Sequence, residues 1–394
     1  MGLIKTSQQQ LSRPGQTLQP VISEGAQSHL VFVFGSSSRM QDPTLPEQLE
    51  QNFPNATLVG CTTAGEITAK GVEDETLTIT SLEFQKTAIR THRVEVTSME
   101  NSYDVGVNLA KSLAEDDLAY LLVLSDGLAV NGSSLVKGIR DTLPKGTPFS
   151  GGLAGDADRF QKTLTLDNDG IHEKSVVGVG FYGSHFSVER GSVGGWAPFG
   201  PFKIVTRSTA NVVYEIDNSR ALDVYSAYLG EEAKDLPASG LLYPLAMSPE
   251  NADSGLIRTL LAIDREQGSL TFAGDVPEGT KVQLMHANFD ELIMGAEKAS
   301  IECLTEKEDA DDFALLISCV GRKLLLGTNI DLEVDAVSGC FGRKVTCTGF
   351  YSYGEIGPYK GSGECELHNQ TMTITTFCEH AEAIQKLPGE LQKV

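Results

Sequence analysis

The sequence lacks the short motifs that mark nucleotide, zinc and serine-hydrolase chemistry. The glycine-rich run Gly151–Gly155 has neither the spacing nor the following lysine of a phosphate-binding loop, and no GxGxxG segment precedes a helix. A GxSxG nucleophile elbow is missing. The seven histidines form no HExxH motif, and the seven cysteines form no CxxC pair. An odd number of irregularly spaced cysteines excludes a disulfide framework and a zinc ribbon, so we expect reduced thiols, most of them in the core.

Positive charge and long apolar runs are also scarce. Lys and Arg number 31 against 53 Asp and Glu, which gives a net charge of -22. A surface this acidic repels phosphate backbones and anionic lipid headgroups, so nucleic acid and membranes are poor partners. No apolar run approaches the roughly 20 residues that a membrane-spanning helix needs. The first 28 residues are polar and lack an apolar signal core. These absences favour a cytoplasmic protein.

An internal repeat organises the chain. Gly60–Phe84, GCTTAGEITAKGVEDETLTITSLEF, returns near the end as Tyr351–Phe377, YSYGEIGPYKGSGECELHNQTMTITTF. Both copies carry Gly-Glu-Ile, then Lys-Gly, then a Thr-rich strand, in the same order. A weaker echo, FSGGLAGD at Phe149–Asp156, follows the same strand–helix lead-in. Self-similarity indicates architecture before any local assignment, so we predict a fold built from duplicated units.

Each unit has the pattern of a strand, a helix, a second strand, the special loop and an antiparallel strand pair. In the first unit the strands are His29–Gly35 and Asn55–Thr63, and the helix is Pro43–Phe53. Glu75–Phe84 and Thr87–Val96 are close enough in sequence to form a hairpin. We therefore predict an α+β fold of mixed, largely antiparallel sheets with outer helices, with a four-layer αββα sandwich as one possible arrangement.

The repeated loops are candidates for a binding site. Glu66 and Glu355 occupy matching positions, and the glycines beside them allow backbone N–H groups to approach a ligand. A carboxylate next to exposed N–H groups and hydroxyls suits a zwitterion such as an amino acid. The alternative is that these loops are tight structural turns in which the two glutamates form caps or buried hydrogen bonds.

Cysteine and histidine chemistry has weaker support. Cys61 lies in a Gly/Thr loop where a nucleophile could sit, but no histidine partner is evident. A haem needs only one axial histidine in an apolar setting, and His286 shares a strand face with Val282 and Leu284. His368 precedes the repeated strand directly. For each histidine, a hydrogen-bonded structural role is the alternative to metal ligation.

Several of these motifs together resemble the FIST sensory family. They are LVGCTTAGEI at Leu58–Ile67, then SGGLAGD, GGWAPFG, GFYSYGEIGP and LHNQTMTIT, in the family's order and over about residues 28 to 380. The resemblance implies a FIST N-like sensory domain at residues 29–220 and a FIST C-like domain at 221–394, after a loose N-terminal arm at 1–28. The positions that match the motifs are the pocket candidates Gly60, Cys61, Thr62, Thr63, Glu66, Tyr353, Glu355, His368 and Asn369.

The resemblance also implies a function. Family members are intracellular input modules, proposed to bind small ligands such as amino acids, and some are fused to output domains. No such fusion is evident here, so we expect a non-catalytic sensor that acts through a separate signalling partner such as a histidine kinase. Stand-alone members resembling this chain are haem-based nitric oxide sensors, which makes haem a possible cofactor with His286 as its ligand. A hydrolase with Cys61 as nucleophile and a protein-binding adaptor are the alternatives from other classes.

Overall fold

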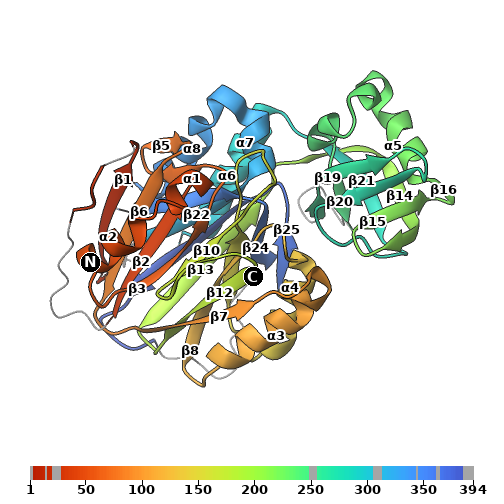
Figure 1. The fold of residues 1–394 in the computed structure, drawn as a ribbon. Coiled ribbons are helices and arrows are strands. Elements are labelled where there is room, and N and C mark those ends of the chain that lie inside the picture. The colour runs from red at the N-terminus through yellow and green to blue at the C-terminus, as the bar shows by residue number, and fades with distance from the viewer. Residues whose placement is uncertain are drawn as a thin grey trace.

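A computed structural model describes residues 3–13, 16–19, 28–247, 255–304, 313–342, 345–360 and 364–384. Three six-stranded sheets form one body, and a smaller strand-rich domain lies beside it (Figure 1). Within the described ranges, no helix has both the length and the apolar character needed to cross a membrane.

The body consists of three units that share one order of six strands. The first contains β1 (Lys5–Leu11), β2 (Ser28–Gly35), α1 (Ser37–Met40), α2 (Leu45–Asn52), β3 (Thr57–Thr62), β4 (Glu66–Thr68), β5 (Gly71–Glu73) and β6 (Leu77–Phe84). The second contains β7 (Ala88–Glu95), η1 (Met99–Asn101), α3 (Ser102–Leu113), β8 (Leu118–Ser125), α4 (Gly132–Thr142), β9 (Phe149–Leu153), β10 (Thr165–Asp167), β11 (Gly170–His172) and β12 (Ser175–Tyr182).

The third unit is interrupted by the smaller domain. It begins with β13 (Phe186–Val193) and resumes with α6 (Phe289–Glu302), β22 (Phe313–Cys319), α7 (Val320–Leu326), η4 (Gly327–Asn329), α8 (Asp331–Phe341), β23 (Thr346–Ser352), β24 (Gly354–Tyr359), β25 (Glu364–His368) and β26 (Met372–Glu379). The inserted domain comprises β14 (Ala197–Thr209), β15 (Val212–Ile216), β16 (Ser219–Arg220), α5 (Ala221–Leu229), η2 (Gly230–Asp235), η3 (Ala238–Leu242), β17 (Leu245–Met247), β18 (Leu256–Arg258), β19 (Leu260–Asp264), β20 (Ser269–Phe272) and β21 (Lys281–His286).

The three units exchange strands in a cycle. The sheet orders are β1-β6-β2-β3-β10-β11, β7-β12-β8-β9-β24-β25 and β13-β26-β22-β23-β4-β5. The hairpin that follows the second strand of each unit thus leaves its own sheet and extends a neighbour's. Each sheet depends on another unit for its last two strands, so the units cannot complete their sheets separately.

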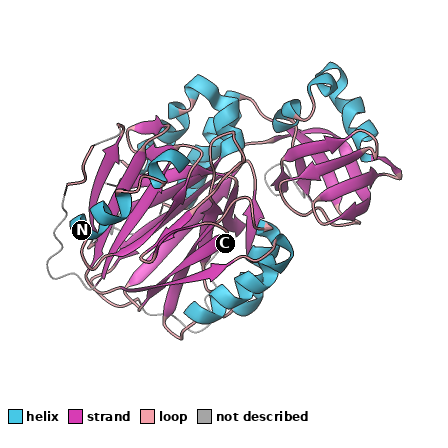
Figure 2. Ribbon diagram, viewed as in Figure 1, coloured by secondary structure: helices cyan, strands magenta, loops and turns pink. Residues whose placement is uncertain are grey.

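One hydrophobic core lies between the three sheets, and helices cover their outer faces (Figure 2). Aromatic side chains from all three sheets meet in this core, where Phe32 stacks on Phe313 with ring centroids 5.7 Å apart and Tyr120 lies 5.7 Å from Phe377. The predicted α+β class with mixed sheets and outer helices is confirmed. The layers differ from an αββα sandwich, because three sheets rather than two enclose the core.

The hairpin predicted for Glu75–Phe84 and Thr87–Val96 does not form, so that prediction is wrong. β6 lies between β1 and β2, whereas β7 pairs with β12 in a different sheet. The buried carboxylate of Glu379 explains the separation, because it accepts hydrogen bonds of 2.8 Å from the backbone N–H groups of Gln85, Lys86 and Thr87. The link between the strands is therefore held by the third unit instead of forming a turn.

The N-terminal segment also differs from the loose arm expected at residues 1–28. β1 pairs antiparallel with β6 along its whole length and completes the first sheet. Residues 1, 2, 14, 15 and 20–27 of this segment lie outside the described residues.

Candidate functional site

The repeated loops meet where the second strands of the three units end. The N–H of Ala64 donates to the Tyr351 carbonyl at 2.8 Å, that of Gly155 to the Thr62 carbonyl at 3.0 Å, and that of Tyr353 to the Leu153 carbonyl at 3.0 Å. The first unit thus donates to the third, the third to the second and the second to the first, which closes a ring. The loops are locked to one another at this ring, and their backbone N–H groups are engaged by protein carbonyls.

Glu66 and Glu355 are completely buried and fully hydrogen-bonded. Thr76 donates its N–H to Glu66 Oε2 at 3.0 Å and its hydroxyl at 2.6 Å, and Thr63 donates to Oε1. Glu355 has the same set of partners from Thr371, at 3.2 and 3.0 Å, and from Ser352 at 2.7 Å. Both carboxyl groups connect their loop to the strand that closes the unit. They therefore form buried hydrogen bonds, which was the alternative to ligand binding in the sequence analysis.

At the position that matches the two glutamates, the second unit connects to its closing strand without a carboxylate. Thr165 occupies the position in its unit that Glu66 and Glu355 occupy in theirs. The residue that follows each of the three pairs with a glycine in a strand of a neighbouring unit. Thr165 Oγ1 lies 2.6 Å from Ser175 Oγ, at the start of the closing strand. The repeated position therefore requires a side chain that bonds the closing strand, and a carboxylate is one of two solutions.

Burial shifts the acidity of both glutamates. Desolvation raises the pKa of Glu66 to about 7, against the opposing effect of the hydroxyl and N–H donors. It raises the pKa of Glu355 to about 8 for the same reason. Because both groups are completely buried and both oxygens of each already accept protein hydrogen bonds, neither carboxyl group is exposed to a ligand.

The other first-loop candidates are packed into the body. A Cβ atom on Gly60 would lie 1.9 Å from the Val33 carbonyl oxygen, so glycine is needed for the close approach of two strands. Thr62 Oγ1 accepts the Leu164 N–H at 3.0 Å, and Thr63 bonds Glu66. Cys61 lies in the central core, where burial raises the pKa of its thiol well above the ordinary value. A buried, protonated thiol is a poor nucleophile, so the structure argues against the cysteine hydrolase.

Tyr353 belongs to a contact between the second and third units. Its ring stacks on Phe160 with centroids 4.4 Å apart, and its hydroxyl donates to the carboxylate of Asp156. Both partners lie in the loop that lengthens the second unit before β10. The lengthened loop is specific to that unit, and its Phe160 ring covers one face of the Tyr353 ring.

The junction between the body and the inserted domain contains His368 and Asn369, together with groups that the sequence did not single out. Asn369 is completely buried, and neither its amide nitrogen nor its amide oxygen has a hydrogen-bond partner among the described residues. The neighbouring Gln370 bonds the Leu241 carbonyl through Nε2 at 3.4 Å, and its Oε1 is unpaired. The carbonyl of Gln370 accepts the indole N–H of Trp196 at 3.0 Å.

Charge is also buried at this junction. The guanidinium of Arg258, from the inserted domain, donates to the Leu367 carbonyl at 3.0 Å and to the Asp275 carbonyl at 3.1 Å. Burial lowers the pKa of Arg258 to about 10, which leaves it charged at neutral pH. Desolvation, with the positive charge of Arg258, lowers the pKa of His368 to about 4, so the imidazole is neutral. The two domains therefore meet through polar groups that are only partly compensated.

A cavity of about 310 Å³ lies at the two segments that connect the domains. The chain leaves the body after β13 and returns after β21, and the first residues of β14 pair with the last of β21. The cavity is lined by Phe199, Leu242, Tyr243, His286 and Ala287. The Phe199 ring lies 6.0 Å from both Tyr243 and His286. An apolar aromatic wall with one imidazole suits a small, largely apolar molecule that carries one hydrogen-bonding group.

This cavity fits a haem poorly. His286 supplies one candidate axial nitrogen, but ligand pockets span about 300–1,000 Å³ and the volume here is at the lower limit. The lining residues are too few to enclose a macrocycle. Among the described residues, no group of three or more His, Cys, Asp or Glu side chains is arranged to hold a metal ion.

Comparison with known proteins identifies the family. The FIST N domain model matches residues 29–219, and the FIST C domain model matches residues 221–358. The chain belongs to the FIST family. It is also 25% identical to the uncharacterized protein MJ1623 of Methanocaldococcus jannaschii over 370 residues. The aligned region covers 84% of this chain and 70% of that protein.

FIST domains are small-ligand sensing domains of signalling proteins. Their sequence boundary at about residue 220 falls inside the inserted domain, between β16 and α5. Side chains from both sides of this boundary, on β14, β15 and α5, share one hydrophobic core. Hydrogen bonds of the third sheet also cross this boundary, because β4 from the FIST N segment pairs with β23 from the FIST C segment. The two FIST segments of this chain are therefore interwoven in one body.

Proposed function

We propose that this FIST protein is a non-catalytic, cytoplasmic sensor whose ligand binds in the cavity of the inserted domain beside its returning connection and changes the position of that domain. The observation that carries the proposal is the location of the cavity. Four of its five lining residues belong to the inserted domain, and the fifth, Ala287, begins the connection that returns to the body. A ligand held there contacts the parts of the chain that a hinge motion must bend.

The buried polar groups at the junction support a second position of the inserted domain. An unsatisfied buried hydrogen-bonding group costs about 1–3 kcal/mol. Among the described residues, Asn369 and Gln370 contribute three such atoms, so the observed position competes with any arrangement that pairs them. A ligand that prefers one arrangement shifts the populations by its difference in affinity. A separate signalling partner, such as a histidine kinase, would respond to that shift.

The single tryptophan of the chain provides the test. Trp196 lies in the outgoing connection, is buried and bonds Gln370, so its fluorescence reports on the hinge. A panel of aromatic and heterocyclic metabolites is titrated into the full chain while tryptophan emission and thermal stability are followed. We expect a saturable change that Tyr243→Ala and His286→Ala abolish. The control variant His92→Ala, which changes an exposed histidine on β7, should bind normally. Retained binding in both cavity variants would refute the proposed site.

Haem-based sensing of nitric oxide is the second candidate, and the position of His286 in the cavity is its only support. It requires the cavity to open further than observed. Stoichiometric haem uptake with a Soret band that shifts with nitric oxide and disappears in His286→Ala would favour it. Weak, non-saturating uptake that is equal in both proteins would exclude it.

A further inference from the structure

Exposed apolar side chains gather on the helices that follow the inserted domain. In the described part of the chain thirteen large hydrophobic side chains are exposed, and six of them lie on α6, α7 and α8 or directly after α6. They are Phe289, Met294, Ile301, Leu304, Leu324 and Leu332, each with 46–53% of its surface exposed. These helices lie together on one side of the body (Figure 1). Apolar residues exposed on neighbouring helices indicate an interaction surface.

The two longer helices, α6 and α8, pack side by side and run in the same direction. At their beginnings, Ile293 and Ile330 pack against one hydrophobic cluster. At their ends, the thiol of Cys340 lies beside the hydroxyl of Ser300. The pair therefore forms one continuous layer over the third sheet.

The outward side of this layer combines apolar and acidic side chains. Along α6, the exposed residues at 290, 294, 297 and 301 follow the spacing of one helix face, opposite the buried Ala296 and Ala299. On α8, Leu332 and Asp335 are exposed, whereas Val334 and Val337 face the core. We call this surface the α6–α8 face and define it by Asp290, Met294, Glu297, Ile301, Leu332 and Asp335.

The charge of the α6–α8 face limits what can cover it. Lys298 is the only basic residue in the sequences of the two helices, and the whole chain has a net charge of -22. A second copy would bring the same acidic face and the same net charge, and like charges across an interface are unfavourable. Anionic lipid headgroups and nucleic acid are repelled for the same reason. A basic partner is attracted.

We propose that the α6–α8 face docks a basic amphipathic helix of a partner protein. The apolar stripe of such a helix would cover Met294, Ile301 and Leu332 and remove their surface from water. Lysine or arginine residues beside the stripe would lie near Glu297 and Asp335. The partner helix would become the third helix of the layer.

The same helices anchor both connections to the inserted domain. Arg322 of α7 donates to the Leu292 carbonyl of α6 at 2.7 Å and to the Gly194 carbonyl in the outgoing connection. Arg322 and Glu333 of α8 form a completely buried ion pair. A change at the hinge would thus reach the elements that carry the face, an inference that rests on the proposed sensor function, whereas the docking itself does not.

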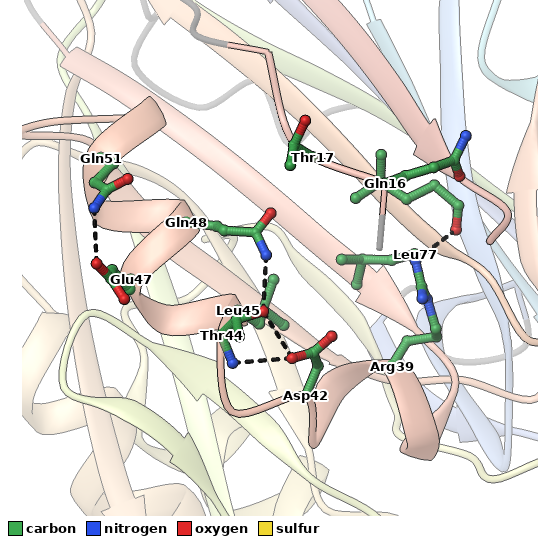
Figure 3. A pocket seen from close by; sticks show the side chains of 11 residues that line it. Gln16, Thr17, Arg39, Asp42, Thr44, Leu45, Glu47, Gln48, Gln51 and Leu77 are labelled. Atoms are coloured by element: carbon green, nitrogen blue, oxygen red, sulfur yellow. Dashed lines mark hydrogen bonds between the residues drawn. The ribbon is translucent and has the colours of Figure 1, made fainter. Parts of the chain in front are cut away.

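The helix α2 provides a matched comparison, because it also covers the outer side of a sheet. None of the exposed large hydrophobic side chains in the described chain lies on α2. Beside it is a second cavity, of about 330 Å³, next to β1. The polar side chains around this cavity bond one another, as Gln51 does with Glu47 at 2.9 Å (Figure 3). A polar outer helix of this kind is what the docking face differs from.

The test is fluorescence anisotropy with a labelled peptide of about 14 leucine and lysine residues, whose leucines have the i, i+3, i+4, i+7 spacing of one helix face. A peptide of the same composition, shuffled so that it has no apolar face, carries the same charge. We expect saturable binding of the first peptide to the full chain and at least about tenfold weaker binding of the second. The double variant Met294→Gln, Leu332→Gln should weaken binding about tenfold or more. Glu297→Gln with Asp335→Asn should weaken it about threefold at low salt.

Two control variants keep the fold and leave the face intact. Leu261→Gln removes a similarly exposed apolar side chain on β19, and Glu47→Gln with Glu50→Gln removes two exposed acidic residues from α2. Both should bind the peptide normally. Equal binding of the shuffled peptide, or unchanged binding in the Met294, Leu332 double variant, would overturn the proposal. A dimer in sedimentation velocity that this double variant dissociates would assign the face to a second copy and also overturn it.

The connection to the hinge is measured separately. The peptide contains no tryptophan, so a change in Trp196 emission on its saturation would show that the face and the outgoing connection are linked. Unchanged emission at saturation would refute that link. Tyr243→Ala, in the hinge cavity, should leave peptide binding unchanged. Failure of the hinge ligand in the metabolite titrations would therefore leave the docking face standing, and failure of the peptide would leave the hinge site standing.

Discussion

The first and third units hold their closing strands with a buried carboxyl group from the repeated loop. The second unit has a pair of hydroxyls at that position, and its buried carboxyl group, Asp126, bonds Lys174 just before the closing strand from a different loop. Glu66 and Glu355 each accept three hydrogen bonds, two of them from one threonine. In the second unit, Thr165 and Ser175 make one hydrogen bond of 2.6 Å. A residue that looks catalytic in sequence, an acid in a glycine-rich loop, is thus one of two chemical solutions to the same structural requirement.

The cost of the two solutions differs. A buried carboxyl group satisfies more donors, but its desolvation raises its pKa into the physiological range. The hydroxyl pair carries no charge and satisfies fewer groups. Single changes at these positions test whether the carboxyl connection contributes more to stability than the hydroxyl connection.

The largest effect is expected from Glu355→Ala. The change leaves the Thr371 N–H and the hydroxyls of Thr371 and Ser352 without their acceptor in a dry interior. We expect the free energy of unfolding to fall by about 3–5 kcal/mol, measured by urea denaturation at pH 7. Glu364→Ala, an exposed position on β25, is the control. A loss below about 1 kcal/mol would mean that the surroundings relax to pair the three donors.

A pH dependence follows from the raised pKa values. The folded pKa of Glu355 is about 8 and its ordinary value is 4.5, so between these limits the unfolded chain loses a proton that the folded chain retains. Stability from this group is therefore complete below about pH 4.5 and falls as pH rises towards about 8. For Glu66 the decline ends near pH 7. We expect Glu355→Gln to flatten the stability profile between these limits, measured by denaturation at a series of pH values; an unchanged slope would contradict the assignment.

Transfer of the hydroxyl connection should rescue part of the loss in the first unit. Glu66→Ala alone leaves the partners of Glu66 unpaired, while the triple change Thr63→Ala, Glu66→Thr and Thr76→Ser copies the second unit, where Ala154, Thr165 and Ser175 hold the corresponding positions. We expect the triple variant to be more stable than Glu66→Ala by about 1 kcal/mol. A less stable triple variant would show that the two connections are not interchangeable.

The smallest effect is expected from Ser175→Ala in the second unit. It removes one hydroxyl of a buried pair, so the free energy of unfolding should fall by about 1 kcal/mol. Thermal and chemical unfolding of the variant provide the measurement. A loss as large as that of Glu355→Ala would remove the distinction between the two kinds of connection.

Local sequence patterns predicted most of the elements and the family of this chain. The Gly-Glu-Ile repeat indicated related units, and short apolar runs located β2 and β3 because such runs depend only on neighbouring positions. The turn at Asp167–Gly170 joins β10 and β11 as the DNDG sequence predicts. The sequence also raised the correct alternative for Glu66 and Glu355, that of buried hydrogen bonds.

Only the tertiary structure decided how the units combine and where ligands could bind. The exchange of hairpins between sheets depends on pairing between distant segments, such as β4 with β23, which no local pattern encodes. The weak echo at Phe149–Asp156 belongs to the second unit, a full copy of the plan, which lacks the Gly-Glu-Ile sequence because Thr165 stands at the position of the glutamate. Both cavities join residues far apart in the chain, as with Phe199 and His286 at the hinge or Leu11 and Gln48 beside β1. Local propensity determines elements, but packing and hydrogen bonding over long distances determine which side chains share a site.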